Sequence, residues 1–354
     1  MSEKSHIALI GTSPINLLRA YLILQEDPQK QITFLDASHQ VGGAWYTDYS
    51  PKGFEIESGC HIWSYQPEVY NYFKKKFDLP ISPINPSADF IGKKIHLPYS
   101  VKNSITSYSA LAKNLLTLNF KAVKGLNENP AVSFRIVGKK NEYPKLGSPM
   151  LVNALVERLK KYDNVTFQFN SRIQSISIED EVTLQLEDAA IKADFIYLTS
   201  VSDIKFIQSR EKLIQLKHER RDYDHLLIQL DQPLKKKLFY WRIMNDKVIH
   251  RVADISYQSA ANEHLILIGI KEDAFNTQTK EELRQYCFEY MKSKKLVDDE
   301  FSFELLKYYQ FPTYYISGDI RAKINELSPE HCYLSHSTDL IYGSYFLLKE
   351  FGAI

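Results

Sequence analysis

The start of the chain alternates between segments of two different periodicities. His6 to Ile10 form a short apolar run of strand length, and Gly11 to Pro14 interrupt it. Ile15 to Leu24 then repeat Leu, Ile and Ala at helical spacing, and Gln31 to Leu35 form a second apolar run that ends at Asp36. Strand, turn, helix and strand in this order predict a βαβ unit, the building block of parallel sheets covered by helices.

The turn between the first strand and the helix has the spacing of a dinucleotide-binding turn. Gly11 stands where the first glycine permits the tight turn, while Ser13 and Asn16 replace the other two glycines. The helix would still direct its N-terminal amides toward a diphosphate, because Ser13 is small and Pro14 stands where a helix needs no free N–H group. Asn16 is bulky where helix and strand should touch, so we expect either a wider separation of the two or an altered cofactor site.

Asp36 lies about 20 residues beyond the turn, where a carboxylate can accept hydrogen bonds from an adenosine ribose. The alternative is an ordinary aspartate that ends a strand at a turn. The combination of turn, helix and carboxylate predicts a site for the ADP half of a dinucleotide.

Length and composition indicate a globular protein of two domains. The chain has 354 residues, 44% of them hydrophobic, and chains beyond roughly 250–300 residues tend to divide into domains. With 44 Lys and Arg against 43 Asp and Glu, the formal charge of +1 offers no overall field for nucleic acid or an anionic membrane. We therefore expect neither as a partner.

The cysteines and the N-terminus indicate a reducing compartment. Cys60, Cys287 and Cys332 are odd in number and widely spaced, which argues against a disulfide framework and a zinc site. The polar N-terminus leads directly into a strand, with no signal sequence or apolar stretch long enough to span a bilayer. The polar cluster from His218 to His225 matches no metal-ligand spacing. We expect a soluble cytoplasmic protein without a metal site.

The pattern beyond residue 80 indicates a discontinuous domain. Residues 82–146 are punctuated by proline and glycine, with one helix over Ser107 to Leu118. Periodicity then returns as a helix over Pro149 to Lys161 and strands at Val165–Phe169, Ile173–Ile178, Val182–Leu186 and Phe195–Leu198.

The last part of the chain is mixed. Strands are expected near Leu226–Leu230 and His264–Ile270, a helix over Lys280–Lys292, and a final strand, turn and helix over Cys332–Leu334 and Gly343–Phe351. We predict one domain from residues 1–80, 145–203 and 325–354, and a second from residues 81–144 and 204–324.

Two further motifs follow the βαβ unit. Gly42-Gly43-Ala44-Trp45-Tyr46 comes shortly after Asp36, and Gly59-Cys60-His61 lies a little further on. In this order the chain resembles the flavin-dependent superfamily of protoporphyrinogen oxidases, amine oxidases and UDP-galactopyranose mutases, most specifically over residues 1–77. Fainter similarity extends over about half of the chain, at Tyr143–Ser148, Asn170–Ile176, Ala193-Asp194, His250-Arg251 and Phe311–Tyr314.

The resemblance implies an α/β fold in which a Rossmann-like FAD/NAD(P)-binding domain carries an inserted mixed α+β substrate domain. It implies FAD with its diphosphate on the first helix, its ribose on Asp36 and its isoalloxazine ring near His61. A turn at Gly343-Ser344 would place a helix N-terminus beside the flavin pyrimidine ring, where it favours the negative charge of a reduced flavin. The implied cofactor-binding residues are Gly11, Ser13, Pro14, Ile15, Asp36, Ala37, Gly42, Gly43, Ala44, Trp45, Gly59, His61, Ile173, Gly343 and Ser344.

Three functions stay open, because the chain departs from the superfamily at Ser13, at Asn16 and at the Ser335–Asp339 segment. The first is an FAD-dependent oxidoreductase of the amine oxidase/protoporphyrinogen oxidase-like type, acting on an unidentified small molecule. The second is a mutase-like flavin-dependent isomerase of a nucleotide sugar, which needs arginines near a diphosphate. The third is a non-catalytic binding or scaffold protein on a flavoprotein fold. The candidates for substrate binding are Arg242, Arg251 and Tyr314, and His61 is the candidate for a catalytic role.

Overall fold

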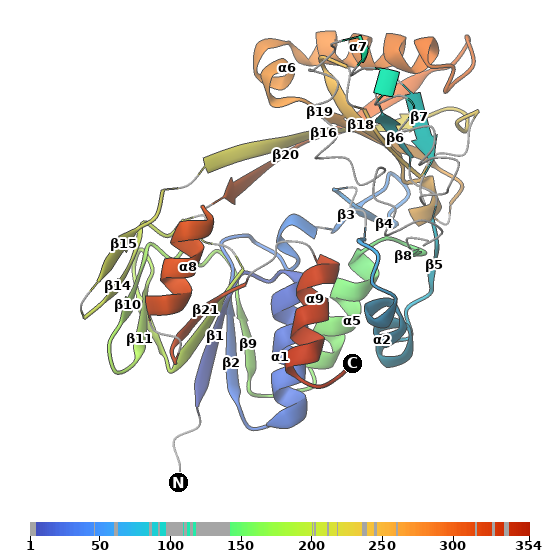
Figure 1. Ribbon diagram of the computed structural model, residues 1–354. Coiled ribbons are helices and arrows are strands. Elements are labelled where there is room, and N and C mark those ends of the chain that lie inside the picture. Colours follow the sequence, from blue (N-terminus) through green and yellow to red (C-terminus); the bar gives the residue numbers. More distant parts are fainter. Residues whose placement is uncertain are drawn as a thin grey trace.

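The computed structural model (Figure 1) carries three main sheets of five, five and seven strands. It describes residues 5–45, 47–59, 63–84, 87–90, 93–96, 109, 112–113, 116–117, 142–199, 201, 203–210, 212–217, 219–235, 239–243, 246–259, 261–315, 317–327, 330–335 and 340–354. The predicted helix over Ser107 to Leu118 falls mostly outside these residues.

The first sheet is parallel and contains the predicted βαβ unit. Its strand order is β21-β13-β1-β2-β9, and every neighbouring pair runs parallel. The strands are β1 (His6–Ile10), β2 (Gln31–Leu35), β9 (Val165–Gln168), β13 (Phe195–Leu198) and β21 (Cys332–Leu334). Its central strands β1 and β2 are almost entirely buried, as expected for a parallel sheet covered on both faces.

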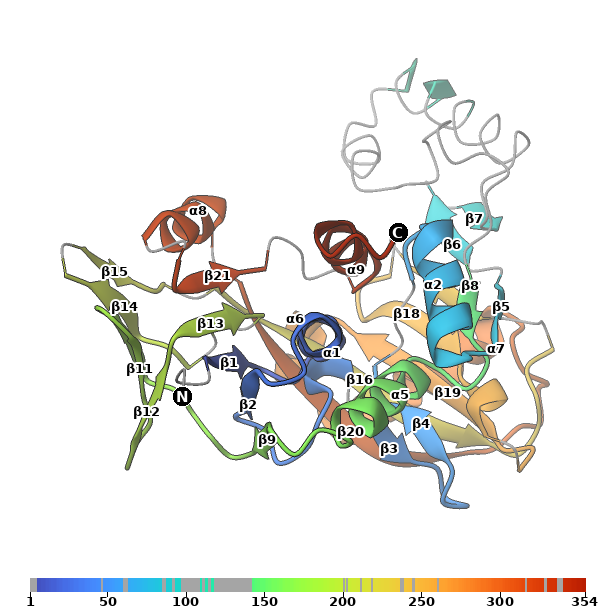
Figure 2. The ribbon, with the colours of Figure 1, turned by 90° about the horizontal axis from the view of Figure 1, so that it is seen from below.

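Helices cover one face of this sheet (Figure 2). They are α1 (Pro14–Glu26), α5 (Pro149–Leu159) and α9 (Leu340–Glu350), and α1 packs against both α5 and α9. The helix α2 (Pro67–Phe77) packs on α5 and α9 further from the sheet. The helices α1, α2 and α5 begin with proline. Proline suits the first helical turn because a backbone N–H group at this position would have no intrahelical partner, and proline has none. Leu18, Phe34, Leu155 and Leu348 belong to the apolar core between these helices and the sheet.

A second sheet and a helix cover the opposite face. The sheet has the order β12-β11-β10-β14-β15, formed by β10 (Ser175–Ile178), β11 (Val182–Gln185), β12 (Ala190–Ala193), β14 (Phe206–Ser209) and β15 (Leu213–Gln215). Ile176 and Ile207 of this sheet share one apolar core with Ala8 and Ile196 of the first sheet. The helix α8 (Gly318–Leu327) joins this core through Ile324.

The third sheet forms the upper part of the molecule in Figure 1. Its order is β20-β16-β19-β18-β17-β6-β7, with β6 (Ser87–Phe90), β7 (Lys93–His96), β16 (Glu219–Leu230), β17 (Tyr240–Arg242), β18 (Ile249–Asp254), β19 (His264–Ile270) and β20 (Phe303–Tyr315). Its outer face packs on α6 (Glu272–Thr277) and α7 (Lys280–Ser293). A capping box between Thr279 and Glu282 starts α7, which explains why this helix begins close to where the sequence predicts it.

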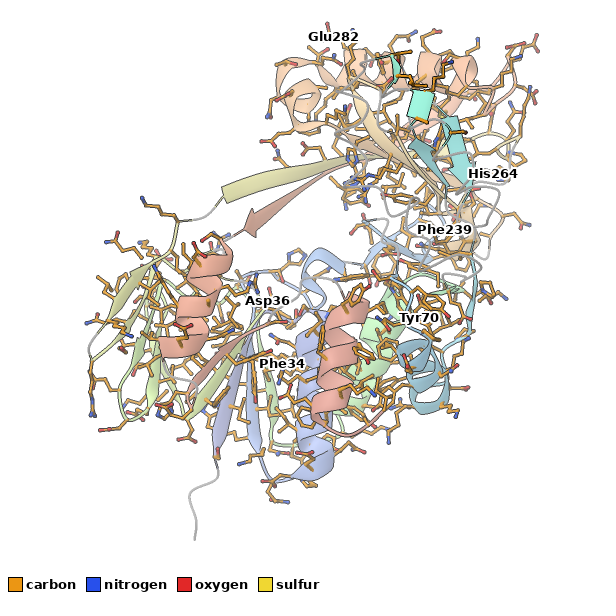
Figure 3. All side chains as sticks on the ribbon, viewed as in Figure 1. Phe34, Asp36, Tyr70, Phe239, His264 and Glu282 are labelled. Carbon is orange, nitrogen blue, oxygen red and sulfur yellow. The ribbon has the colours of Figure 1, made fainter. Side chains whose placement is uncertain are left out.

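The inner face of the third sheet meets the part of the chain that follows the βαβ unit. Ile56 of β4 (Glu55–Glu57), which pairs with β3 (Thr47–Tyr49), packs with Leu227 and Leu267 of the sheet. Phe239, labelled at this junction in Figure 3, makes an edge-to-face contact with Tyr143 of β8 (Glu142–Pro144), with 5.3 Å between the ring centroids. The strand β8 pairs with β5 (Ile81–Pro83). The two parts of the chain are thus joined by buried contacts.

The end of the chain differs from the expectation in one respect. Gly343 and Ser344 lie inside α9, so the predicted turn at these residues is wrong. Leu340 and Ile341 are already buried in the core, and their burial extends the helix N-terminal to the glycine. Among the described residues, no helix combines the length and apolar character needed to cross a bilayer.

Candidate functional site

The turn between β1 and α1 is tight because of its single glycine. Gly11 has φ 87°, a left-handed conformation that favours glycine, and its N–H donates to Leu35 O at 2.8 Å. Ser13 follows as the N-cap of α1, and its hydroxyl accepts from the N–H of Asn16 at 3.4 Å. Pro14 and Ile15 form the buried first turn of the helix. The helix therefore starts where the sequence predicts, with its N-terminus at the edge of the sheet.

Asn16 occupies the contact between helix and strand without a clash. Its side-chain amide is buried and donates to Ile10 O at 2.9 Å and to Gly11 O at 2.8 Å, and lies 3.2 Å from Thr199 Oγ1. A third glycine would leave these two carbonyl groups without that donor. Asn16 thus replaces close packing by hydrogen bonding, which the spacing of the motif does not reveal.

Asp36 closes β2 and binds two neighbouring segments. Its Oδ2 accepts from the N–H of Thr12 at 2.7 Å and from Thr12 Oγ1 at 2.5 Å, while Oδ1 accepts from the N–H of Ser38 at 2.9 Å. Thr12 Oγ1 in turn accepts from the N–H of Gly42 at 3.0 Å. Thr12 and Ser38 were not among the predicted site residues, and their only signal in the sequence is a hydroxyl beside each turn.

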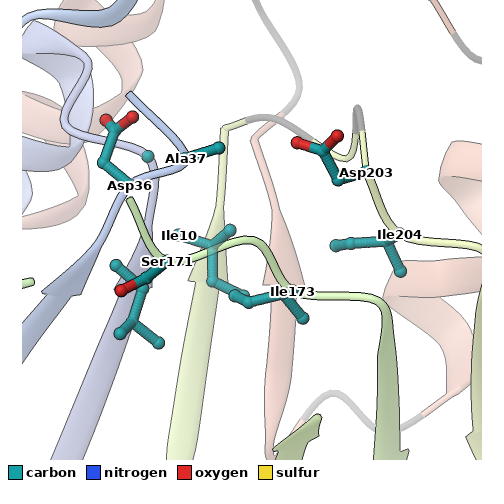
Figure 4. Close-up of a pocket in the computed structure, with 9 residues that line it drawn as sticks. Ile10, Asp36, Ala37, Ser171, Ile173, Asp203 and Ile204 are labelled. Carbon is teal, nitrogen blue, oxygen red and sulfur yellow. The ribbon is translucent and has the colours of Figure 1, made fainter. Parts of the chain in front are cut away.

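A small pocket of about 70 Å³ opens beside Asp36. Figure 4 shows Asp36 and Asp203 on opposite sides of it, with apolar side chains between them. Its lining contains four predicted residues, Gly11, Asp36, Ala37 and Ile173, together with Ile10, Leu35, Ser171, Asp203 and Ile204. Because ligand pockets usually measure roughly 300–1,000 Å³, this cavity can hold only one end of a dinucleotide.

The Gly42-Gly43 doublet lies beside the same turn through the bond from Gly42 to Thr12. Both glycines have positive φ, 113° at Gly42 and 55° at Gly43. The short helix η1 (Gly43–Trp45), which includes Ala44, follows, and the N–H of Trp45 donates to Gly42 O at 2.9 Å. The doublet is thus held next to the N-terminal end of α1.

The other predicted cofactor residues are not part of the pocket lining. Gly59 is buried at the end of a described segment, and His61 lies outside the described residues. Gly343 and Ser344 are buried inside α9. Their predicted roles toward a flavin ring stay predictions.

The predicted substrate-binding residues lie in the third sheet, away from this pocket. Arg242 of β17 and Arg251 of β18 are paired neighbours. Tyr314 lies in β20, where its backbone is paired with Arg220. The antiparallel pairing of β17 and β18 brings these two arginines together, although they are nine positions apart in the sequence.

His250, next to Arg251, has an unusual environment. Burial, together with the positive charges of Arg251, Lys271 and Arg242, lowers the pKa of His250 from 6.5 to about 3. Each of these effects disfavours the imidazolium form, so the ring is neutral at neutral pH.

Stability should therefore fall in mild acid. The unfolded chain binds a proton at His250 below pH 6.5 whereas the folded chain does so only near pH 3, so stability is lost as pH falls through this window. Between about pH 7.5 and about pH 5 we expect His250 to reduce the free energy of unfolding by about 2 kcal/mol. Urea unfolding at both pH values should show a smaller acid loss in His250→Asn, and an unchanged loss in the matched surface variant His39→Asn. An equal acid loss in His250→Asn and in the parent protein would contradict this prediction.

Comparisons with known proteins identify solved structures of similar fold. No family model matches the sequence, and no curated protein matches it by sequence. A candidate protoporphyrinogen oxidase from Exiguobacterium sp. 255-15 aligns over 100% of this chain and 99% of its own, with a TM-score of 0.66 at 12% identity. Reduced UDP-galactopyranose mutase covers 99% of this chain and 94% of its own, with a TM-score of 0.67 at 14% identity. Putrescine oxidase bound to putrescine covers 99% and 98%, with a TM-score of 0.64 at 11% identity.

These structures span nearly the whole chain, and their likeness confirms the predicted α/β fold, a Rossmann-like parallel sheet combined with antiparallel and mixed sheets. The chain therefore shares its fold with this candidate protoporphyrinogen oxidase, with UDP-galactopyranose mutase and with putrescine oxidase.

Proposed function

We propose that this protein binds FAD and is an FAD-dependent oxidoreductase of the amine oxidase/protoporphyrinogen oxidase-like type, acting on a small molecule in the cytoplasm. The observation that carries the proposal is the pocket at the end of β1 and β2, where Asp36 lies beside the N-terminal turn of α1. Ligands of open α/β sheets bind at this edge, outside the carboxyl ends of the strands.

The residues at this edge fit the adenosine half of FAD. Ile173 and Ile204 offer apolar walls for an adenine, and Asp36 at the rim offers acceptors for ribose hydroxyl groups. The diphosphate would lie at the N-terminus of α1, where the helix dipole favours negative charge.

Ser38 does not prevent a ribose from reaching Asp36. Ser38 Oγ lies 2.6 Å from both Asp36 Oδ1 and Gln40 O, but a hydroxyl group has only one proton to donate. Ser38 can therefore donate to Gln40 and leave Oδ1 for a ribose hydroxyl without losing a hydrogen bond. Thr12 meanwhile holds Oδ2 and fixes the orientation of the carboxylate.

Bound FAD would supply a ring that accepts a hydride from the substrate. The protein would contribute position. Asp36 would hold the ribose, and the Gly42-Gly43 loop, which is bonded to Thr12, would lie near the diphosphate. The inner face of the third sheet packs on Ile56 of β4. His61 is proposed to lie near the ring.

A protein that keeps this fold without a flavin is the second candidate. It is favoured by the acceptors of Asp36, which Thr12 and Ser38 already satisfy within the chain, and by Asn16, which closes the turn with its own hydrogen bonds. In this alternative the network stabilises the turn and has no ligand.

The visible absorption spectrum of the purified protein distinguishes the two candidates. We expect flavin bands after addition of excess FAD and removal of the unbound cofactor, and bleaching of these bands by a reductant. A protein that stays colourless after this treatment would refute flavin binding and leave the binding or scaffold function.

A further inference from the structure

Four residues form one row across the inner face of the third sheet. His225 pairs with Gly269, Gly269 pairs with Arg251, and Arg251 pairs with Arg242. Directly paired residues of neighbouring strands point to the same face of a sheet. The next row on this face contains Leu227, Leu267 and Ala253, which pack with Ile56 of β4. The two arginines therefore lie on the face that meets the dinucleotide-binding part of the chain.

A β-bulge brings a further side chain into this row. The register of β18 shifts between Ile249 and Arg251, so that His250 is an extra residue opposite Gly269. A Cβ atom on Gly269 would lie 2.5 Å from His250 Nε2 and 2.5 Å from Arg251 Cγ. Both side chains thus cross directly over the glycine, and any larger residue at this position would push them apart.

The side chains around His250 are positively charged, whereas the His250 ring itself is neutral. An Arg251 guanidinium N–H donates to His225 Nε2, because an arginine has no acceptor atom. Arg242, Arg251 and Lys271 are the positive charges around the neutral His250. Arg242 is exposed at the end of the row and forms no ion pair with any described residue. Two arginines at paired positions on one sheet face, with the His250 imidazole over the adjoining Gly269, suit the planar oxygens of a carboxylate or the oxygens of a phosphate.

We propose that the Arg242–Arg251–His250 cluster over Gly269 binds an oxyanion group, a carboxylate or a phosphate, of the substrate. The proposal rests on the proposed function in one respect, because it takes the anion to be part of the substrate of that enzyme. Binding of the anion itself needs no flavin. Arg242 and Arg251 hold the oxygens, His250 contributes a ring N–H, and Gly269 provides the space for both side chains of the bulge.

Isothermal titration calorimetry of the full chain with inorganic phosphate, and separately with acetate, at constant ionic strength tests the proposal. We expect saturable binding of at least one anion, weakened at least about 10-fold in Arg242→Gln and in His250→Asn, since a hydrogen bond to a charged group is lost. Arg210→Gln, at an exposed arginine directly after β14, is the control and should bind as the parent protein does. The preferred anion then distinguishes a phosphate from a carboxylate.

Absence of saturable binding of both anions, or unchanged affinity in both Arg242→Gln and His250→Asn, would overturn the inference. Equal weakening in Arg210→Gln would overturn it as well, because the effect would then be one of net charge. Flavin bands recorded on the same samples separate this failure from that of the proposed function. Flavin without anion binding refutes only the cluster, and anion binding without flavin refutes only the cofactor.

Discussion

Asp36→Ala is expected to lower the free energy of unfolding of the flavin-free protein by about 3 kcal/mol. The carboxylate accepts from the N–H and the hydroxyl of Thr12 and from the N–H of Ser38, and it is buried, so its removal leaves these donors without an acceptor. Urea unfolding followed by far-ultraviolet circular dichroism measures the change.

The same substitution should reduce retention of added FAD by at least about 10-fold, because a ribose bond to a charged acceptor contributes roughly 1.5–3 kcal/mol. Ser38→Ala is the matched control. It removes only a hydroxyl that can bind Gln40 instead, so we expect a loss of at most about 1 kcal/mol in stability and no loss of FAD affinity. A stable Asp36→Ala protein that still retains FAD would remove this residue from both roles.

Asn16→Asp should destabilise the protein by about 3 kcal/mol at neutral pH. The replacement has the same shape, but a carboxylate oxygen would stand where the amide now donates to Ile10 O at 2.9 Å and Gly11 O at 2.8 Å. Two hydrogen bonds become repulsive contacts, in a position from which water is excluded. Thermal and urea unfolding of the purified variant measure the effect.

The size of this loss should depend on pH, since a protonated carboxyl group can again donate to one carbonyl. We expect the deficit of Asn16→Asp to shrink as pH falls toward about 5, because burial raises the pKa of a carboxyl group. Asn16→Gly, which restores the usual glycine of a dinucleotide-binding turn, is the control. It loses the hydrogen bonds without the repulsion and should be less destabilised than Asn16→Asp, with no such pH dependence. The opposite order of stability would show that the amide bonds do not hold the turn.

Asp36→Ala and Asn16→Asp both alter the same hydrogen-bonded turn. Asn16 holds the carbonyl groups at the end of β1, and Asp36 holds Thr12, which binds the Gly42 loop. The chain's own hydrogen bonds therefore hold this edge of the sheet, and they would present a dinucleotide with a fixed surface. Preorganisation of this kind reduces the entropy lost on binding.

Local sequence patterns were sufficient to predict the elements of the βαβ unit and their order. The change from a strand run to helical spacing at Gly11 and Pro14, and the strand that ends at Asp36, needed only neighbouring residues, because periodicity reports which face of an element is apolar. The same reason applies to α5 and α7, whose starts carry a proline and a capping box.

Tertiary structure decided the contacts between these elements. Asn16 approaches Thr199, which is 183 positions away, and no window of sequence contains both residues. The strands β14 and β15 pair beside β10, the start of α9 extends past Gly343 because Leu340 is buried, and the bulge at His250 exists only opposite Gly269. Local pattern specifies how each segment can fold, whereas the partner of a buried polar group depends on which distant segment packs against it.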